Sequence, residues 1–240
     1  MFGASNSCLT YSFRGRTFEF VEVVNQTGLN AGTINVTGPN GTRTLQQPSP
    51  GDYLLDLAPA TPGLPGGIPG LGQGASFLTA GSYTYQGTGG SDVGPFTATR
   101  NFTDGIDWTN KNQLGTINRS QGLTVTWNGG DPSEENIWIF GASFAESNFL
   151  SGLPLQSLDE VSGAAFFCSA NAGLGSFTVG PEILSALPVS AVISAPGFGT
   201  FSTGSLQVGA FGIPRPFDAP GIDIGFFSYT NTASILTDYK

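Results

Sequence analysis

The chain has 240 residues, of which only 10% are charged, and its 17 Asp and Glu outweigh eight Lys and Arg to give a net charge of −9. With so few cations, the chain cannot neutralise many phosphates, so nucleic acids and anionic membrane surfaces are disfavoured as partners. No apolar run reaches the ~20 residues of a membrane-spanning helix, so membrane insertion is not expected.

The first part of the chain predicts short strands. Runs that alternate apolar and polar residues, the pattern of half-buried strands, are separated by Gly, Pro and Asn. They cover residues 9–13, 17–24, 33–37, 42–45, 52–57, 82–86 and 93–98. The Asn40-Gly41 pair predicts a hairpin turn, because these residues readily adopt positive φ. The Pro- and Gly-rich segment 58–74 is expected to be a crossover loop.

The second part centres on two apolar strands, 123–127 and 137–140, on either side of a Gly-Gly-Asp-Pro turn. Further strands are expected at 164–169, 176–179, 203–211 and 222–229. A short helix is expected at 180–188, because Pro181 is favoured at a first helical position. This spacing favours sandwiches over a parallel α/β sheet. We therefore expect an all-β chain of two tandem antiparallel β-sandwich domains, 1–99 with a strand-forming amino-terminal segment and 100–240, Ig-like at least in the second.

The chemistry available to the chain is limited by the absence of His. This removes catalytic triads that use His and every zinc site with a His ligand. The acidic residues Asp131, Glu134 and Glu135 fall in one turn and are interpreted as solvated. We expect no enzyme and no cofactor; the alternative is calcium, with Asp104 and Asp107 as ligands.

Aromatic residues are the best candidates for a binding surface. In the strand 137–140, Trp138 and Phe140 face opposite to the two Ile residues, so one of the two faces is core. Trp138 and Phe140 then form a sugar-stacking surface or an interface anchor if exposed, or a layer packed beneath the loop 142–163. Tyr83 and Tyr85 are the second candidates for glycan binding. Trp127 shares a face with Leu123 and Val125 and is expected in the core.

Cys8 and Cys168 are the only two cysteines and lie far apart in the sequence. A disulfide between them would close a very long loop and stabilise the fold. The alternative is two separate thiols, with Cys168 a small buried residue of an apolar strand.

Several segments carry a resemblance to a known group of proteins. They include residues 29–41 (LNAGTINVTGPNG), 89–96 (GGSDVGPF) and 117–131 (INRSQGLTVTWNGGD). From about residue 29 to its end, the chain resembles a group of uncharacterised secreted β-sandwich proteins from acidobacterial soil bacteria. The resemblance implies export, with this sequence beginning after a signal peptide; the segment 58–74 departs from the group. No catalytic residues are attached to the group.

The functional expectation is a non-enzymatic secreted or cell-surface structural or binding protein. Its partners would be other protein subunits, including copies of itself, joined through the edges of β-strands, with the amino-terminal strand as the donor. The alternative is a carbohydrate-binding module with glycan ligands, and a carboxylate-dependent glycosidase is the least favoured.

Overall fold

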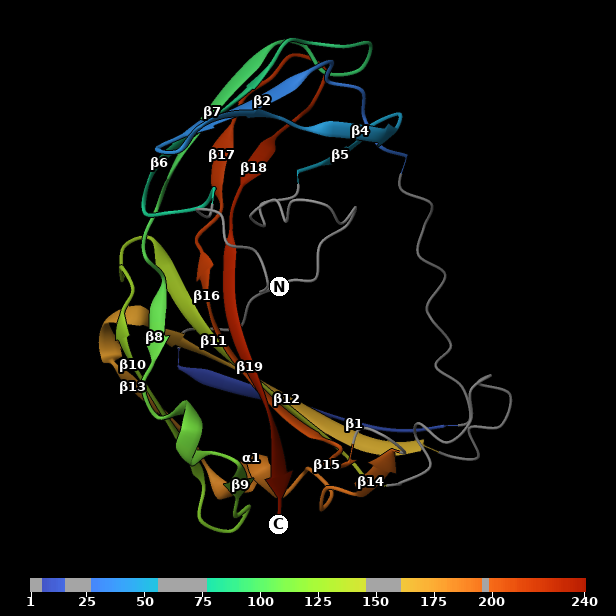
Figure 1. Ribbon diagram of the computed structural model, residues 1–240, viewed down its shortest axis with the longest axis vertical. Coiled ribbons are helices and arrows are strands. Elements are labelled where there is room, and N and C mark those ends of the chain that lie inside the picture. Colours follow the sequence, from blue (N-terminus) through green and yellow to red (C-terminus); the bar gives the residue numbers. More distant parts are fainter. Residues whose placement is uncertain (1–5, 16–26, 56–76, 146–160, 196–198) are drawn as a thin grey trace. The chain divides into compact units, whose positions relative to one another are not determined.

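The computed structural model describes residues 6–15, 27–55, 77–145, 161–195 and 199–240 (Figure 1). These residues form antiparallel β-sheets with very little helix, so the expected all-β class is confirmed. Among them, no helix has the length and apolar character that crossing a membrane requires. The expected strand at 17–24, the loop at 58–74 and most of the loop at 142–163 lie outside the described residues.

The chain forms two compact units, and each is assembled from separate stretches of sequence. Within the described residues, unit 1 combines residues 6–15 with 105–213 and 230–240, while unit 2 combines residues 27–104 with 214–229. The expected boundary between residues 99 and 100 lies close to one of these junctions. The sequence pattern did not indicate that the amino-terminal strand joins the later residues, or that residues 214–229 join the earlier ones.

Unit 1 contains a long six-stranded sheet and a short three-stranded sheet. The six-stranded sheet runs in the order β1 (Ser7–Gly15), β12 (Val161–Asn171), β11 (Glu135–Phe144), β16 (Gly204–Gly212), β19 (Thr230–Tyr239), β9 (Thr116–Ile117). The three-stranded sheet runs in the order β13 (Ser176–Val179), β10 (Leu123–Gly129), β8 (Ile106–Trp108). The strands β14 (Val192–Ala195) and β15 (Gly199–Ser202) form a separate hairpin. The expected short helix is present as α1 (Pro181–Leu184), with Pro at its first turn.

The core of unit 1 lies on one face of the six-stranded sheet. Ile137 and Ile139 of β11, with Phe166 of β12, are fully buried there, because alternate residues of each strand point to this side. Trp127 and Val125 of β10 belong to the same cluster, as expected from their alternation with polar residues. The side chains between these buried ones, on the opposite face of the six-stranded sheet, are therefore the ones available for a function.

Unit 2 is built on a four-stranded sheet with two hairpins. The sheet runs in the order β3 (Gly41–Thr44), β2 (Ile34–Gly38), β6 (Gly81–Gly87), β7 (Phe96–Phe102), and the hairpins are β4 (Gln46–Ser49) with β5 (Asp52–Leu54) and β17 (Arg215–Phe217) with β18 (Gly225–Phe227). The predicted Asn40-Gly41 turn joins β2 to β3, and Gly41 has a φ of 102° there.

Two small apolar clusters hold unit 2 together. One gathers around Tyr83, Val36 and Phe77, and the other joins Ile34 and Val93 to the hairpin of residues 214–229. Aromatic rings make the contacts between that hairpin and the four-stranded sheet. They are Tyr85 with Phe227, Phe96 with Phe217, and Phe102 with Phe227 and Tyr229.

Candidate functional site

The outward face of the six-stranded sheet in unit 1 carries a continuous group of aromatic and apolar side chains. They come from three adjacent strands, β1, β12 and β11. We call this group the aromatic face, and it consists of Leu9, Tyr11, Phe13, Trp138, Phe140, Phe144 and Phe167.

The register of the strands brings these residues together in rows. Leu9 lies opposite Phe167, which lies opposite Phe140, so three apolar side chains stand side by side across the sheet. The row continues on β16 and β19 with Gln207 and then Ser234. An apolar row that ends in amide and hydroxyl groups offers both stacking and hydrogen bonding to one ligand.

Trp138 and Phe167 hold similar orientations. Their ring planes are within 13° of parallel, and their centroids are 6.3 Å apart. The indole of Trp138 lies against β16 at Gly209, where an added Cβ would come within 2.7 Å of Nε1. Glycine is required there by this close approach. The backbone of β16 therefore supports the indole and fixes its orientation on the sheet.

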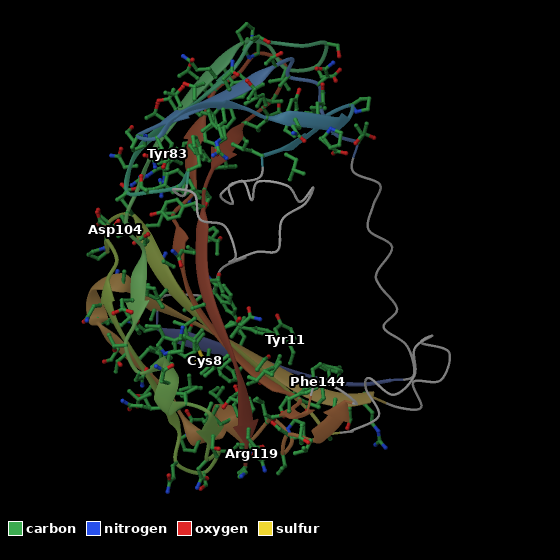
Figure 2. The ribbon with its side chains drawn as sticks, in the orientation of Figure 1. Cys8, Tyr11, Tyr83, Asp104, Arg119 and Phe144 are labelled. Carbon is green, nitrogen blue, oxygen red and sulfur yellow. A yellow bond between two sulfur atoms is a disulfide. The ribbon has the colours of Figure 1, made fainter. Side chains whose placement is uncertain are left out.

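The β1 side of the aromatic face is the most exposed. Tyr11 is 62% exposed and Leu9 is 47% exposed, whereas Trp138, Phe140 and Phe167 are partly buried. Figure 2 shows the side chains of Tyr11 and Phe144 on the same side of the sheet. Exposed large apolar side chains that adjoin one another on one face are typical of an interaction surface.

The aromatic face carries no charge in a chain whose net charge is −9. Every outward position of the described parts of β1, β12, β11 and β16 is apolar, Gly, Ser, Asn or Gln. The first outward acidic residue is Asp238, near the end of β19, where it forms an ion pair with Lys240. Such a face does not repel neutral ligands and offers no partner for a charged one.

The two Tyr residues predicted for glycan binding lie in unit 2, on the inward face of its sheet. Tyr83 has no exposed surface, and its hydroxyl donates to the carbonyl of Phe77 and accepts from the backbone N–H of Thr79. A ring without exposed surface offers no stacking site, so Tyr83 is a core residue. Tyr85 packs edge-on against Phe227, and burial, followed by the influence of Tyr83, raises the pKa of its hydroxyl.

The residues predicted as calcium ligands, Asp104 and Asp107, are both exposed. Asp107 lies in β8 opposite Asn128, and Asp104 is the last residue of its stretch of unit 2. Within the described ranges, no three His, Cys, Asp or Glu side chains gather as a metal centre. The calcium site stays a prediction.

The acidic turn between β10 and β11 has a structural role. Asp131 accepts hydrogen bonds from the hydroxyl and the backbone N–H of Ser133, and these bonds lower the pKa of its carboxyl. Glu135 is fully buried rather than solvated as expected, and its Oε2 accepts from the backbone N–H of Asp131. Its carboxylate closes the turn from inside, a position that residue type alone does not reveal.

Cys8 and Cys168 form a disulfide, which decides between the two alternatives that the sequence left open. They are directly opposite each other in the antiparallel pair of β1 and β12, and Cys168 is fully buried. The bond spans 160 residues of sequence and fixes β1 to the sheet beside the aromatic face (Figure 2).

Part of the aromatic face was not found from the sequence. The alternation in residues 9–13 indicated a strand with Leu9, Tyr11 and Phe13 on one face, but not which strand lies beside it. Phe166 and Phe167 are adjacent in an apolar run, so the pattern did not tell which one faces outward.

Comparisons of the chain with protein-family models, with curated proteins and with solved structures found no match.

Proposed function

We propose that this chain is a non-enzymatic secreted or cell-surface binding protein and that its aromatic face binds neutral polysaccharides. The observation that carries the proposal is the row of Leu9, Phe167 and Phe140 on an uncharged sheet face that ends at Gln207. Trp138 lies beside this row in an orientation close to that of Phe167.

The chemistry of neutral sugars matches these groups. The C–H faces of a pyranose ring are apolar and stack on aromatic rings, while its hydroxyls bond to amides and hydroxyls such as those of Gln207 and Ser234. An anionic polysaccharide would find no cation on this face and would be repelled by the net charge of −9. The proposed ligand class is therefore the neutral glycans.

Location outside the cytoplasm is supported by the disulfide between Cys8 and Cys168, because disulfides persist in oxidising compartments. The Ig-like kinship expected for the second domain stays a prediction, and so does membership of the acidobacterial group.

The test is a binding assay with neutral and anionic polysaccharides, by pull-down on insoluble material and by affinity electrophoresis for soluble material. We expect retention on at least one neutral polymer such as a β-glucan and none on polygalacturonate. Trp138→Ala should weaken binding by about three- to tenfold, since an aromatic contact contributes about 0.5–1.5 kcal/mol.

The matched control is Phe226→Ala, which removes a 60% exposed aromatic side chain from unit 2. It should leave binding unchanged. Equal loss in both variants, or no retention on any neutral polysaccharide, would contradict the proposal.

A further inference from the structure

β1 is the outermost strand of the six-stranded sheet in the described part of the chain (Figure 1). It pairs with β12 over its whole length, from Ser7 to Gly15. It contains no Pro or Lys, which are common protections of an exposed strand edge, and its one charged residue, Arg14, lies next to its carboxyl-terminal end. Edge strands of this length act as templates for pairing with another strand.

The disulfide determines how this edge can be used. A strand that is covalently joined to its neighbour through Cys8 and Cys168 stays in its own sheet, so β1 is not transferable to another molecule while the bond is intact. The donor role expected for the amino-terminal strand segment stays a prediction, since its second strand, 17–24, lies outside the described residues. For β1 itself, pairing is open at its outer edge while it stays in its own sheet.

The pairing of Cys8 with Cys168 also indicates which way the backbone N–H and C=O groups of β1 point. The Cα atoms of Cys8 and Cys168 are 4.0 Å apart, the short spacing of a non-hydrogen-bonded antiparallel pair. Pairs alternate along a strand, so Leu9 and Tyr11 exchange hydrogen bonds with β12. The N–H and C=O groups of Thr10 and Ser12 consequently point to the outer edge.

The sequence of β1 is nearly symmetric about Tyr11. Thr10 and Ser12 flank it with hydroxyls on the opposite face of the strand, and Leu9 and Phe13 follow with large apolar side chains on the same face as Tyr11. A strand with this symmetry is complementary to a second copy of itself that runs in the opposite direction, as a twofold interface requires.

We propose that two copies of this chain pair antiparallel through the outer edges of β1, about a twofold axis at Tyr11. Thr10 then exchanges hydrogen bonds with Ser12 of the second copy, and Leu9 lies opposite the second copy's Phe13. The side chains of Leu9 and Tyr11, 47% and 62% exposed in one copy, gain apolar neighbours across the axis. The two aromatic faces become parts of one continuous sheet. This pairing of β1 strands does not depend on which ligand the aromatic face binds.

The neighbouring symmetric registers fit less well. An axis at Thr10 leaves Phe13 opposite Ser7 of the second copy, and an axis at Ser12 leaves Leu9 opposite the second copy's Gly15. Only the axis at Tyr11 pairs all three large outward side chains with one another.

Cysteine cross-linking tests both the pairing and its register. In the proposed dimer Tyr11 faces its own copy in a non-hydrogen-bonded pair, within the Cα range of a disulfide. Tyr11→Cys should therefore give a covalent dimer under mild oxidation, resolved on a non-reducing gel. Leu9→Cys alone should not, because the two copies of that position lie roughly 13 Å apart along the strands. A mixture of Leu9→Cys and Phe13→Cys chains should cross-link to each other.

The unmodified chain provides an independent measurement. Sedimentation velocity should show a monomer–dimer equilibrium, and Thr10→Pro should shift it to monomer, because proline removes an N–H on the outer edge and none that bonds to β12. Thr10→Val is the matched control and should leave the dimer intact. A monomer at every concentration, or equal cross-linking of Tyr11→Cys and Leu9→Cys chains, would overturn the proposal.

Discussion

The two units of this protein are stabilised in different ways. Unit 1 has one continuous core of mainly aliphatic side chains, long strands in register, and a disulfide across its first strand pair. Unit 2 has two small clusters and depends on aromatic contacts between its sheet and a hairpin, residues 214–229, from much later in the sequence.

The two units therefore hold distant parts of the sequence together in two different ways. Unit 1 uses a covalent bond, which reduces the entropy of the unfolded chain. Unit 2 uses ring packing, which acts only in the folded state. All three Trp residues belong to unit 1, so tryptophan fluorescence reports on that unit alone and allows the two to be followed separately.

The largest effect is expected from removal of the disulfide. In the chain-entropy model, a bond that closes a loop of 160 residues contributes about 5 kcal/mol to the free energy of unfolding. A chain with both Cys8→Ala and Cys168→Ala should therefore unfold at clearly lower denaturant concentration when followed by tryptophan fluorescence. An unshifted transition would show that the disulfide adds little to the stability of unit 1.

A smaller effect, confined to unit 2, is expected from Phe102→Ala. The centroid of the Phe102 ring lies 4.7 Å from that of Tyr83 and 4.6 Å from that of Tyr229. Phe102 therefore links the four-stranded sheet to residues 214–229. The truncation should cost about 3 kcal/mol, the lower end for Phe because the ring is only partly buried. The near-ultraviolet circular dichroism of the unit 2 tyrosines (Tyr53, Tyr83, Tyr85 and Tyr229) should be lost at lower denaturant concentration, while the tryptophan transition of unit 1 stays in place.

Phe226→Ala is the control in the same hairpin. Its ring is exposed, so the free energy of unfolding should change by no more than about 0.5 kcal/mol. A loss as large as that of Phe102→Ala would mean that the hairpin itself, rather than the ring contacts, determines the stability of unit 2.

A smaller effect at neutral pH than that of Phe102→Ala is expected from Tyr239→Phe, and this variant distinguishes the two units at alkaline pH. Tyr239 is fully buried in unit 1, and its burial raises the pKa of its hydroxyl far above the ordinary value. The unfolded chain then loses this proton before the folded one, so stability is complete below about pH 10 and falls as the pH rises further.

Tyr239→Phe removes the ionisable hydroxyl. Its stability, followed by tryptophan fluorescence, should therefore fall less steeply above about pH 10 than that of the parent. At neutral pH it should cost about 1 kcal/mol, because the hydroxyl donates to the carbonyl of Ser205. A variant that loses stability above pH 10 as steeply as the parent would assign the alkaline transition to other groups. Tyr85→Phe is the corresponding variant for unit 2, where burial also raises the pKa.

Local patterns predicted the strands well, because alternation is a property of neighbouring residues. The strand at 123–127 and the opposite faces of Ile137 and Trp138 follow from the two-residue period alone. The partner of β1 did not follow, since 160 residues separate Cys8 from Cys168 and nothing local selects one strand among many.

The candidate site was predictable in the same limited sense. Trp138 and Phe140 could be assigned to a face opposite the Ile residues, but the exposure of a face depends on which segment packs over it. Tyr83 illustrates this limit, because its strand has the same alternation as β1 and yet its aromatic face is the buried one. The row that joins Leu9 to Phe140 depends on register across three strands, which the sequence does not specify.

The discontinuous course of the chain has a practical consequence for anyone who expresses fragments of it. A clone that stops at Asp104 lacks the later hairpin whose rings complete unit 2, and a clone that starts at Gly105 lacks β1 and one of the two cysteines. Neither fragment contains all the residues of its unit. An exchange of sequence at that junction would separate residues that belong to the same unit, in both units.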